Sequence, residues 1–283
     1  MKIAHLILAH SQPAQLERLI DSLQHENAYF FIHIDRKVKS SHFSFLASRN
    51  RVFLISNRER VRWGAYSMVQ ATLNGFLAIA GSGIAIDVVN LLSGSDYPLK
   101  SAEEIHDFFA KNPDKNFMEY RFIPEEWKEA ETRFTEYHLT NYHFRGKTML
   151  QRWMNKFFPA RKMPDLLVPV GKSQWLSITM EAVQFILNYL DEHPEVVRFF
   201  KLTWAPDEII FQTILYNSTF RSKLINNNLR YIDWSAGNAS PKTLDYEDVD
   251  KLLASRALFA RKFDMARHPE IFDMLDKRIH SHS

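Results

Sequence analysis

Two adjacent carboxylates, Asp207 and Glu208, lie in the stretch "TWAPDEIIFQTIL" and suggest a catalytic role. A carboxylate in a cleft can take a proton from a substrate hydroxyl. The pair also fits a structural role, because Pro206 and the apolar residues after it have helical spacing, and the first turn of a helix favours acidic residues. Trp204, just upstream, offers a flat aromatic face that suits a sugar ring. One acid could therefore cap the helix while the other faces a substrate.

A second polar group follows the apolar run "AYFFIHID" and consists of His33, Asp35, Arg36 and Lys37. Surface loops are generally polar, so the group does not require a function. As a binding site, it would offer the Asp35 carboxylate to the donors of a ribose or a uracil. The pattern alone leaves both interpretations open.

Three basic residues lie at the edges of short segments: Lys242 in "SPKTL", and Arg261 and Lys262 in "LFARKFD". Cationic side chains on a protein surface are usually solvated, so a solvated role is the more common one. Binding of a ligand phosphate is the alternative for these residues.

The acidic residues do not form an obvious metal site. Asp248 and Asp250 make a D-x-D pattern, but "DYEDVDKLL" reads as the acidic first turn of a helix, so we reject them as ligands. The segment "SGSDYP", where a metal-binding pair is expected, supplies one acid, Asp96. We therefore expect no metal and no other cofactor.

Alternating strands and helices must position these residues. Apolar runs predict strands at 2–9, 28–35, 51–56, 84–94 and 116–122. Helical spacing predicts one helix through Leu16 and Leu23, and a longer one from about Ala65 whose inward residues are Val69, Leu73, Phe76, Leu77 and Ala80. This alternation is typical of a doubly wound, mostly parallel sheet, which binds ligands at the carboxyl ends of its strands. Those ends carry His10, the group at 33–37 and residues 93–98.

The stretch "FRGKTMLQRWMNKFFPARK" (144–162) mixes apolar residues at helical spacing with six Lys or Arg residues. A helix with a buried apolar face and a solvated basic face is the favoured interpretation. The alternative is a segment that touches an anionic membrane or a lipid-linked acceptor.

Composition bounds the remaining choices. The chain has 283 residues and a formal charge of +3, which is too weak to suggest a nucleic-acid partner. It contains no cysteine, so disulfides and thiolate metal sites are excluded. The opening "MKIAHLILAH" is apolar over one strand's length, whereas a membrane span needs about 20 apolar residues. We expect one continuous domain in the cytoplasm.

Six stretches, in order, resemble glycosyltransferase family 14, which holds the core-2 and I-branching β-1,6-N-acetylglucosaminyltransferases and the peptide xylosyltransferases. They are "FFIHIDRK", "RVRWGAYSMVQATL", "VVNLLSGSDYPLK", "GKSQWLSIT", "WAPDEIIFQTIL" and "LFARKFD". The resemblance implies a GT-A-type fold, an inverting mechanism and a UDP-sugar donor used without a divalent metal.

The resemblance also implies roles for single residues. The glutamate of the family's P-D-E motif is the catalytic base and falls on Glu208, so that Asp207 would hold the turn. The lysine that contacts the diphosphate falls on Lys262. The second basic ligand matches Lys242, with a short gap and a Lys in place of an Arg. Donor binding would further use His10, His33, Asp35 and Arg261, and acceptor binding would use Glu119, Tyr120, Arg121, Trp175, Trp204, Asp96 and Asp207.

These expectations combine into one hypothesis. The domain would span 1–283, with a nucleotide-binding half at 1–115, an acceptor-binding and catalytic half at 116–264, and a C-terminal helix and tail at 265–283. It would move a GlcNAc-like sugar or xylose from a UDP-sugar to a hydroxyl of a glycan or glycoconjugate. Mammalian members have a membrane anchor and disulfides that this sequence lacks, so it resembles a bacterial relative, cytoplasmic or peripheral on the inner face of the membrane. The rival functions are a hydrolase, which needs two opposed carboxyl groups, and a non-catalytic sugar-binding protein.

Overall fold

Strand β1 (Ile3–Ala9) runs through the middle of a seven-stranded sheet, and all seven of its residues are buried. A computed structural model describes residues 1–280. The strand order is β3-β2-β1-β4-β7-β6-β8. The other strands are β2 (Ala28–Ile34), β3 (Val52–Leu54), β4 (Val88–Ser93), β6 (Asn116–Phe122), β7 (Val170–Thr179) and β8 (Leu224–Asn226).

The sheet is mostly parallel. Strands β3, β2, β1 and β4 pair in parallel, β7 runs antiparallel to both β4 and β6, and β8 is parallel to β6. Continuous apolar runs in β1 and β2 suit this position, because helices cover both faces of such a sheet. The expected mostly parallel central sheet, flanked by helices in one domain, is confirmed.

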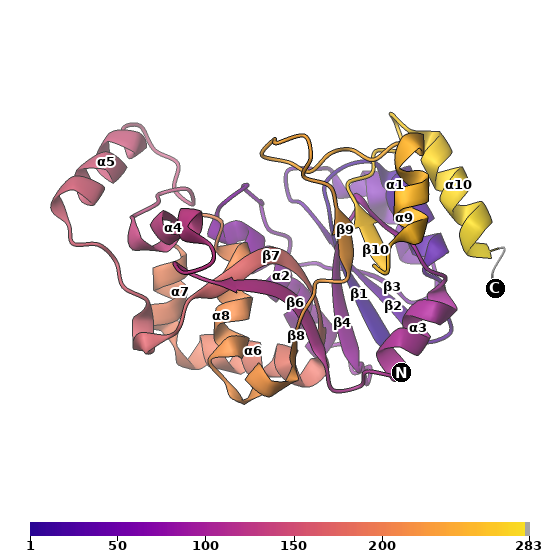
Figure 1. Ribbon diagram of the computed structural model, residues 1–283, viewed down its shortest axis with the longest axis horizontal. Helices are drawn as coiled ribbons and strands as arrows, with labels where there is room; N and C mark the ends of the chain where they lie inside the picture. Colours follow the sequence, from indigo (N-terminus) through magenta and orange to yellow (C-terminus); the bar gives the residue numbers. More distant parts are fainter. Residues whose placement is uncertain (281–283) are drawn as a thin grey trace.

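The two faces of β1 feed two separate cores. Ala4, Leu6 and Leu8 pack under α2 (Tyr66–Ala80), α6 (Met180–Glu192), α7 (Pro194–Phe200) and α8 (Ile210–Tyr216). The alternate residues Ile3 and Ile7 pack on the other side under α1 (Pro13–Ser22), α3 (Ala102–Ala110), α9 (Val249–Ala254) and α10 (Pro269–His280). Figure 1 shows α6 and α8 on one side of the sheet and α1, α9 and α10 on the other.

A second, three-stranded sheet lies at the carboxyl end of β4. Its order is β5-β10-β9, where β5 is Asp96–Pro98, β10 is Phe259–Arg261 and β9 is Arg230–Ile232. Strand β10 is antiparallel to β5, and their register places Arg261 opposite Asp96. Two segments far apart in the sequence, 96–98 and 259–261, therefore meet beside the carboxyl edge of the main sheet.

Most of the predicted elements are confirmed, with changes at their ends. The fourth strand begins at Val88, where it pairs with Ile3, rather than at 84. Helix α2 was expected to turn Leu77 and Ala80 inward, and this is wrong. Both are exposed, Leu77 at 54%, because Val69, Leu73 and Phe76 define the buried side. The boundaries proposed at 115/116 and 264/265 stay predictions, and the expected C-terminal tail includes residues 281–283, which lie outside the described residues.

The segment predicted to be a helix with a buried apolar face differs most from expectation. Helix α5 (Lys147–Phe157) forms, but none of its residues is buried. It projects from the body of the protein beyond α4 (Glu131–Thr135), as Figure 1 shows. Across residues 1–280, no helix has both the length and the apolar character needed to cross a membrane.

Candidate active site

The carboxyl ends of β1 and β2 open into a cavity with a volume of about 920 Å³. Its wall continues along β6 and β7, the turn at 204–208 and the segment 228–241, and ends at Arg261 and Lys262. Residues that the sequence suggested from distant motifs therefore line one space. We call it the main cavity.

Glu208 reaches the main cavity from a short 3-10 turn, Pro206–Glu208. The sequence predicted a continuous helix from Pro206, and this is wrong: Ile209 has φ −129°, and α8 starts only at Ile210. Arg133 Nη1 donates to Glu208 Oε2 at 2.5 Å. The Glu208 side chain is 33% exposed, so it remains accessible from the cavity.

Arg133 is held between two indole rings. Its guanidinium carbon lies 4.4 Å from the centroid of Trp127 and 4.6 Å from that of Trp204. The Trp204 N–H donates to the Arg133 carbonyl at 2.9 Å, which ties the two segments together. A planar guanidinium stacks well on aromatic faces, so the cation is fixed where it meets Glu208.

The turn that carries Glu208 needs two glycines. A Cβ on Gly171 of β7 would lie 2.2 Å from the Glu208 carbonyl oxygen, so a side chain there would push the turn away. A Cβ on Gly64, which has φ +68°, would lie 2.7 Å from Trp204 Nε1. Ala205 N–H also donates to the Gly64 carbonyl at 2.9 Å. Backbone contact on both sides thus sets the position of Glu208.

Asp207 differs from its neighbour in environment. It lines the main cavity but is only 7% exposed, and within residues 1–280 its Oδ1 has no hydrogen-bond partner. Burial, followed by the charge of Glu208, raises the pKa of Asp207 to about 7. In the described part of the chain the Asp207 side chain does not cap the turn, which corrects the expectation that it would.

The ends of β1 and β2 contribute His10, His33 and Asp35 to the main cavity. His33 Nε2 accepts a hydrogen bond from Glu59 N at 2.8 Å, and burial lowers the pKa of His33 to about 4. His33 is therefore neutral at physiological pH. Asp35 is buried, and it accepts from Lys37 N at 2.8 Å while Lys37 Nζ lies 3.3 Å away. The main cavity thus has a buried carboxylate at this end.

Three cations lie near the small sheet, and they differ in burial and in their partners. Arg230 is buried and donates to Asn90 Oδ1 at 2.5 Å and to the Leu91 carbonyl at 2.8 Å. Arg261 lies over Trp175, 4.2 Å from the ring centroid, and donates to Asp96. Lys262 lines the cavity too, and within residues 1–280 it forms no ion pair. Of these three cations, Lys262 is therefore the best placed to receive an anionic ligand.

Two of the predicted site residues are not at the cavity surface. Asp96 is fully buried and accepts from Ser93 Oγ at 2.8 Å and from Arg261 Nε at 3.0 Å, so it holds Arg261 and does not face an acceptor. Lys242 lies outside the cavity lining, with its Nζ 2.7 Å from Asp248 and 3.6 Å from Asp245. The Lys242 ammonium, which was expected to bind phosphate, therefore forms ion pairs with these two carboxylates. The buried position of Asp96 contradicts a contact with the acceptor, whereas phosphate binding by Lys242 stays a prediction.

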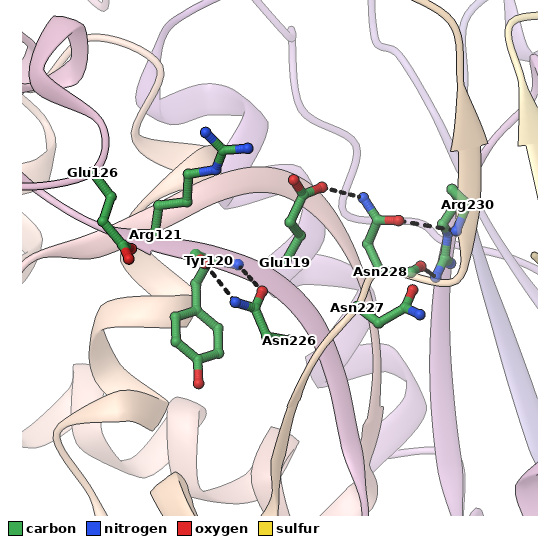
Figure 2. A pocket seen from close by; sticks show the side chains of 8 residues that line it. All are labelled: Glu119, Tyr120, Arg121, Glu126, Asn226, Asn227, Asn228 and Arg230. Carbon is green, nitrogen blue, oxygen red and sulfur yellow. Dashed lines mark hydrogen bonds between the residues drawn. The ribbon is translucent and has the colours of Figure 1, made fainter.

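A smaller cavity of about 550 Å³ adjoins the main one (Figure 2). Glu119, Arg121, Asn228 and Arg230 line both cavities, so the two are adjacent. Asn228 Nδ2 donates to Glu119 Oε2 at 2.9 Å. Figure 2 shows that Glu119 and Arg121 point to one side of β6 while the Tyr120 ring points to the other.

Tyr120 therefore shares the smaller cavity with Glu119 and Arg121 but does not reach the main cavity with them. Its ring lies 5.6 Å from that of Tyr216, and it lines only the smaller cavity. Successive side chains of a strand alternate between faces, and this separates Tyr120 from Glu119 and Arg121.

Several cavity residues were not predicted from the sequence. Arg133 and Trp127 belong to a segment with no motif, and Lys172 Nζ lies 4.9 Å from the Trp127 ring. Trp63 is 68% exposed beside the cavity and meets Trp204 edge-on, with centroids 5.4 Å apart. The one sequence signal that could have indicated these residues is the number of tryptophans, because a flat indole ring suits a sugar ring.

The candidate metal ligands lie elsewhere. Within the part of the chain that the structure describes, the one cluster of three acidic or histidine side chains is formed by Asp165, His193 and Glu195, none of which lines the main cavity. Asp248 accepts from Lys242 and from Asp245 N, which agrees with its rejection as a metal ligand. Metal independence itself stays an expectation.

Comparison with known proteins gives one family and two groups of relatives. Residues 3–255 match the family described as "Branch: Core-2/I-Branching enzyme". Xylosyltransferase 2 of Homo sapiens is 27% identical over 99% of this chain and 34% of its own length, and a xylosyltransferase of Ciona intestinalis is 22% identical with the same coverage. The chain thus spans about a third of the length of these curated relatives.

Solved structures show weaker similarity. Apo mouse xyloside xylosyltransferase 1 has a TM-score of 0.42 and 11% identity, covering 91% of this chain and 97% of that one. The galactosyltransferase LgtC, in complex with donor and acceptor sugar analogues, has a TM-score of 0.44 and 10% identity, covering 99% and 95%.

Proposed function

Because this chain belongs to the Core-2/I-branching enzyme family, we propose that it transfers a sugar from a UDP-sugar donor to a hydroxyl group of a glycan or glycoconjugate acceptor. The observation that carries the proposal is that Glu208 and Lys262 line the same cavity. The names of the relatives favour xylose as the donor sugar, and a GlcNAc-like sugar is the other candidate.

In this mechanism Glu208 is the base. Arg133 binds Oε2, and within residues 1–280 Oε1 receives no hydrogen bond, so Oε1 can accept the proton of an acceptor hydroxyl. The hydroxyl oxygen then attacks the anomeric carbon as the bond from that carbon to UDP breaks, and UDP leaves with its electron pair. Attack from the face opposite UDP inverts the anomeric centre, and one base is sufficient.

The leaving diphosphate needs positive charge. Lys262 lies at the cavity wall with no ion-pair partner among residues 1–280, and Arg261 beside it is fixed by Asp96 and Trp175. Preorganised cations can stabilise a developing negative charge as a metal would. This arrangement supports transfer without a divalent metal. Asp35 and His33, at the strand ends, are suited to the ribose and uracil of the donor.

The acceptor would lie among the aromatic residues. Trp204 and Trp63 meet edge-on beside Glu208, and the adjoining smaller cavity offers Glu119 and Arg121 for hydroxyl groups. Asp207 does not provide the second, opposed carboxyl group that a hydrolase needs, because it belongs to the same turn as Glu208 and is buried.

The test is a panel of UDP-sugars, assayed for UDP release and UDP binding with EDTA and with Mn²⁺. Glu208→Gln should lower the rate by about 10²–10⁴-fold, the usual contribution of a general base, with unchanged UDP affinity. Activity that EDTA abolishes and Mn²⁺ restores would refute metal independence. Binding of UDP without turnover of any donor would favour the non-catalytic protein.

A further inference from the structure

Helix α5 exposes an apolar face on a projecting part of the fold (Figure 1). Trp153 is 50% exposed, Phe157 61% and Met149 76%. Leu150, Phe144 and Phe158 are also exposed. We call the segment 136–161 the arm. A surface helix ordinarily turns its apolar side toward the protein, so this arrangement requires an explanation.

The polar side of α5 holds the helix to the first residues of the arm. Gln151 Oε1 accepts a hydrogen bond from Leu139 N at 2.9 Å, and Asn155 Oδ1 accepts one from Tyr137 N at 2.7 Å. The Trp153 ring lies 5.6 Å from Phe157 and 5.3 Å from Phe158, which joins the three into one aromatic patch. Helix α5 therefore turns its polar side toward the protein and its apolar side toward solvent, where a partner can bind it.

The charge around this patch identifies the partner. Residues 144–162 contain six Lys or Arg and no Asp or Glu, although the whole chain carries only +3, and all six except Arg161 are exposed or half-buried. Arg152 and Lys156 are exposed on α5, and Lys156 Nζ lies 5.3 Å from the Phe157 ring. Exposed aromatic residues beside a surplus of cations are typical of helices that lie in the headgroup region of an anionic bilayer. We propose that the arm docks the protein on an anionic lipid surface.

The base of the arm is attached beside the main cavity. Arg161 is buried and donates to the carbonyls of Glu136 at 3.0 Å and of Leu202 at 2.7 Å, and it lies 4.0 Å from the Phe199 ring. Burial lowers the pKa of Arg161 only to about 10, so it stays charged at neutral pH. One cation thus fixes both ends of the arm to the end of α7, directly before Trp204.

This attachment suggests what the docking serves. The arm begins a few residues after Arg133, so a docked arm would hold the cavity near the membrane surface. If the proposed sugar transfer is correct, the acceptor class that benefits is a glycan carried on a lipid. The docking itself does not depend on that function.

The experiment uses the whole chain with vesicles of phosphatidylcholine, with or without phosphatidylglycerol, and measures cosedimentation without donor or acceptor. We expect binding only to the anionic vesicles, and loss of that binding near 1 M salt, where the Debye length is about 3 Å. Because no sugar is present, failure of docking and failure of sugar transfer are distinguishable.

Paired variants separate the apolar and charged parts of the surface. Trp153→Glu with Phe157→Glu should weaken binding by about tenfold or more, since two large aromatic side chains no longer enter the bilayer. The matched control is Leu77→Glu with Phe45→Glu, which are 54% and 42% exposed elsewhere. Arg152→Glu with Lys156→Glu should also weaken binding, whereas Lys111→Glu with Arg256→Glu, an equal charge change at exposed sites, should not.

Three results would overturn the proposal. The first is no binding to anionic vesicles at low salt. The second is binding by both arm variants at the level of the wild type. The third is a dimer in solution that the arm variants dissociate, together with absent vesicle binding, because the apolar face would then belong to an interface between two copies.

Discussion

Gly171 of β7 lies against the backbone of Glu208, and a Cβ at this glycine would come within 2.2 Å of the Glu208 carbonyl oxygen. Strand and turn are in direct backbone contact at the residue that we propose as the base. The position of the carboxylate therefore depends on a residue that has no side chain.

Gly171→Ala should displace the Pro206–Glu208 turn. We expect a stability loss of about 1–3 kcal/mol, as for other overpacked sites, and a larger fractional loss of kcat than of UDP affinity. Thermal unfolding and steady-state kinetics measure both. Gly94→Ala is the matched control, because its Cβ would lie 3.5 Å from the nearest atom, an ordinary contact. Full activity in Gly171→Ala would contradict the proposed dependence.

Arg133→Lys tests the stacked cation. Lysine keeps the charge but cannot lie as a plane between Trp127 and Trp204, so Glu208 should lose its fixed partner. We expect kcat to fall by about 10–100-fold, equivalent to about 1.4–2.7 kcal/mol, with little change in UDP affinity. Arg198→Lys, at an exposed position, should leave kcat unchanged. Equal rates for the two variants would show that charge alone suffices.

Asp207→Asn should change how stability depends on pH. The folded pKa of Asp207 is raised to about 7 from 3.8, so between these values the unfolded carboxyl releases its proton while the folded one retains it. The stability of the wild type should therefore fall as pH rises through this window, by roughly 2–4 kcal/mol for this group. Asparagine does not ionise, so its advantage should be near zero at pH 4 and largest at pH 8.

Urea unfolding at pH 4 and pH 8 measures this difference. The control is Asp191→Asn on an exposed face of α6, where the two pH values should give the same shift relative to the wild type. If the Asp207→Asn and wild-type stability curves stay parallel from pH 4 to pH 8, then Asp207 does not hold a proton near neutrality.

Lys262→Ala and Lys242→Ala should separate in UDP binding. Loss of the free Lys262 ammonium should weaken binding by roughly 1.5–3 kcal/mol, the worth of a charge-assisted hydrogen bond. Lys242→Ala should leave UDP affinity within about twofold but lower stability, because it removes the partner of Asp248, a carboxylate that is only 2% exposed. Calorimetric titration with UDP measures the affinity of each variant. Equal losses of affinity would restore the original assignment of Lys242.

The sequence was most informative where a pattern is local. The apolar runs of β1 and β2 predicted buried parallel strands, since such strands are covered on both faces. The continuous helix expected from Pro206 was not found, because Gly171 brings β7 against the turn and Ile209 leaves helical geometry. The contact between Gly171 and Glu208 joins residues that are 37 positions apart, so the local periodicity of the sequence does not predict it.

The site could be predicted only in part, for a similar reason. Asp96 and Arg261 were assigned separate ligand contacts, yet they pair with each other through the register of β5 and β10. Arg133 lies in no motif, and its role depends on Trp127 of the same segment and on Trp204 from a distant one. Helix α5 has the periodicity of a buried helix, and periodicity alone does not show whether another element covers the apolar face.

The small sheet has a consequence for the order of assembly during synthesis. The seventh strand of the main sheet is complete at Asn226, but β10 enters between β5 and β9 only once residues 259–261 have left the ribosome. Until then Asp96 lacks its ion-pair partner Arg261, and the cavity wall has no Lys262. A nascent chain can therefore form most of its core before it acquires the cations proposed to hold a diphosphate, so donor binding would be the last property to appear.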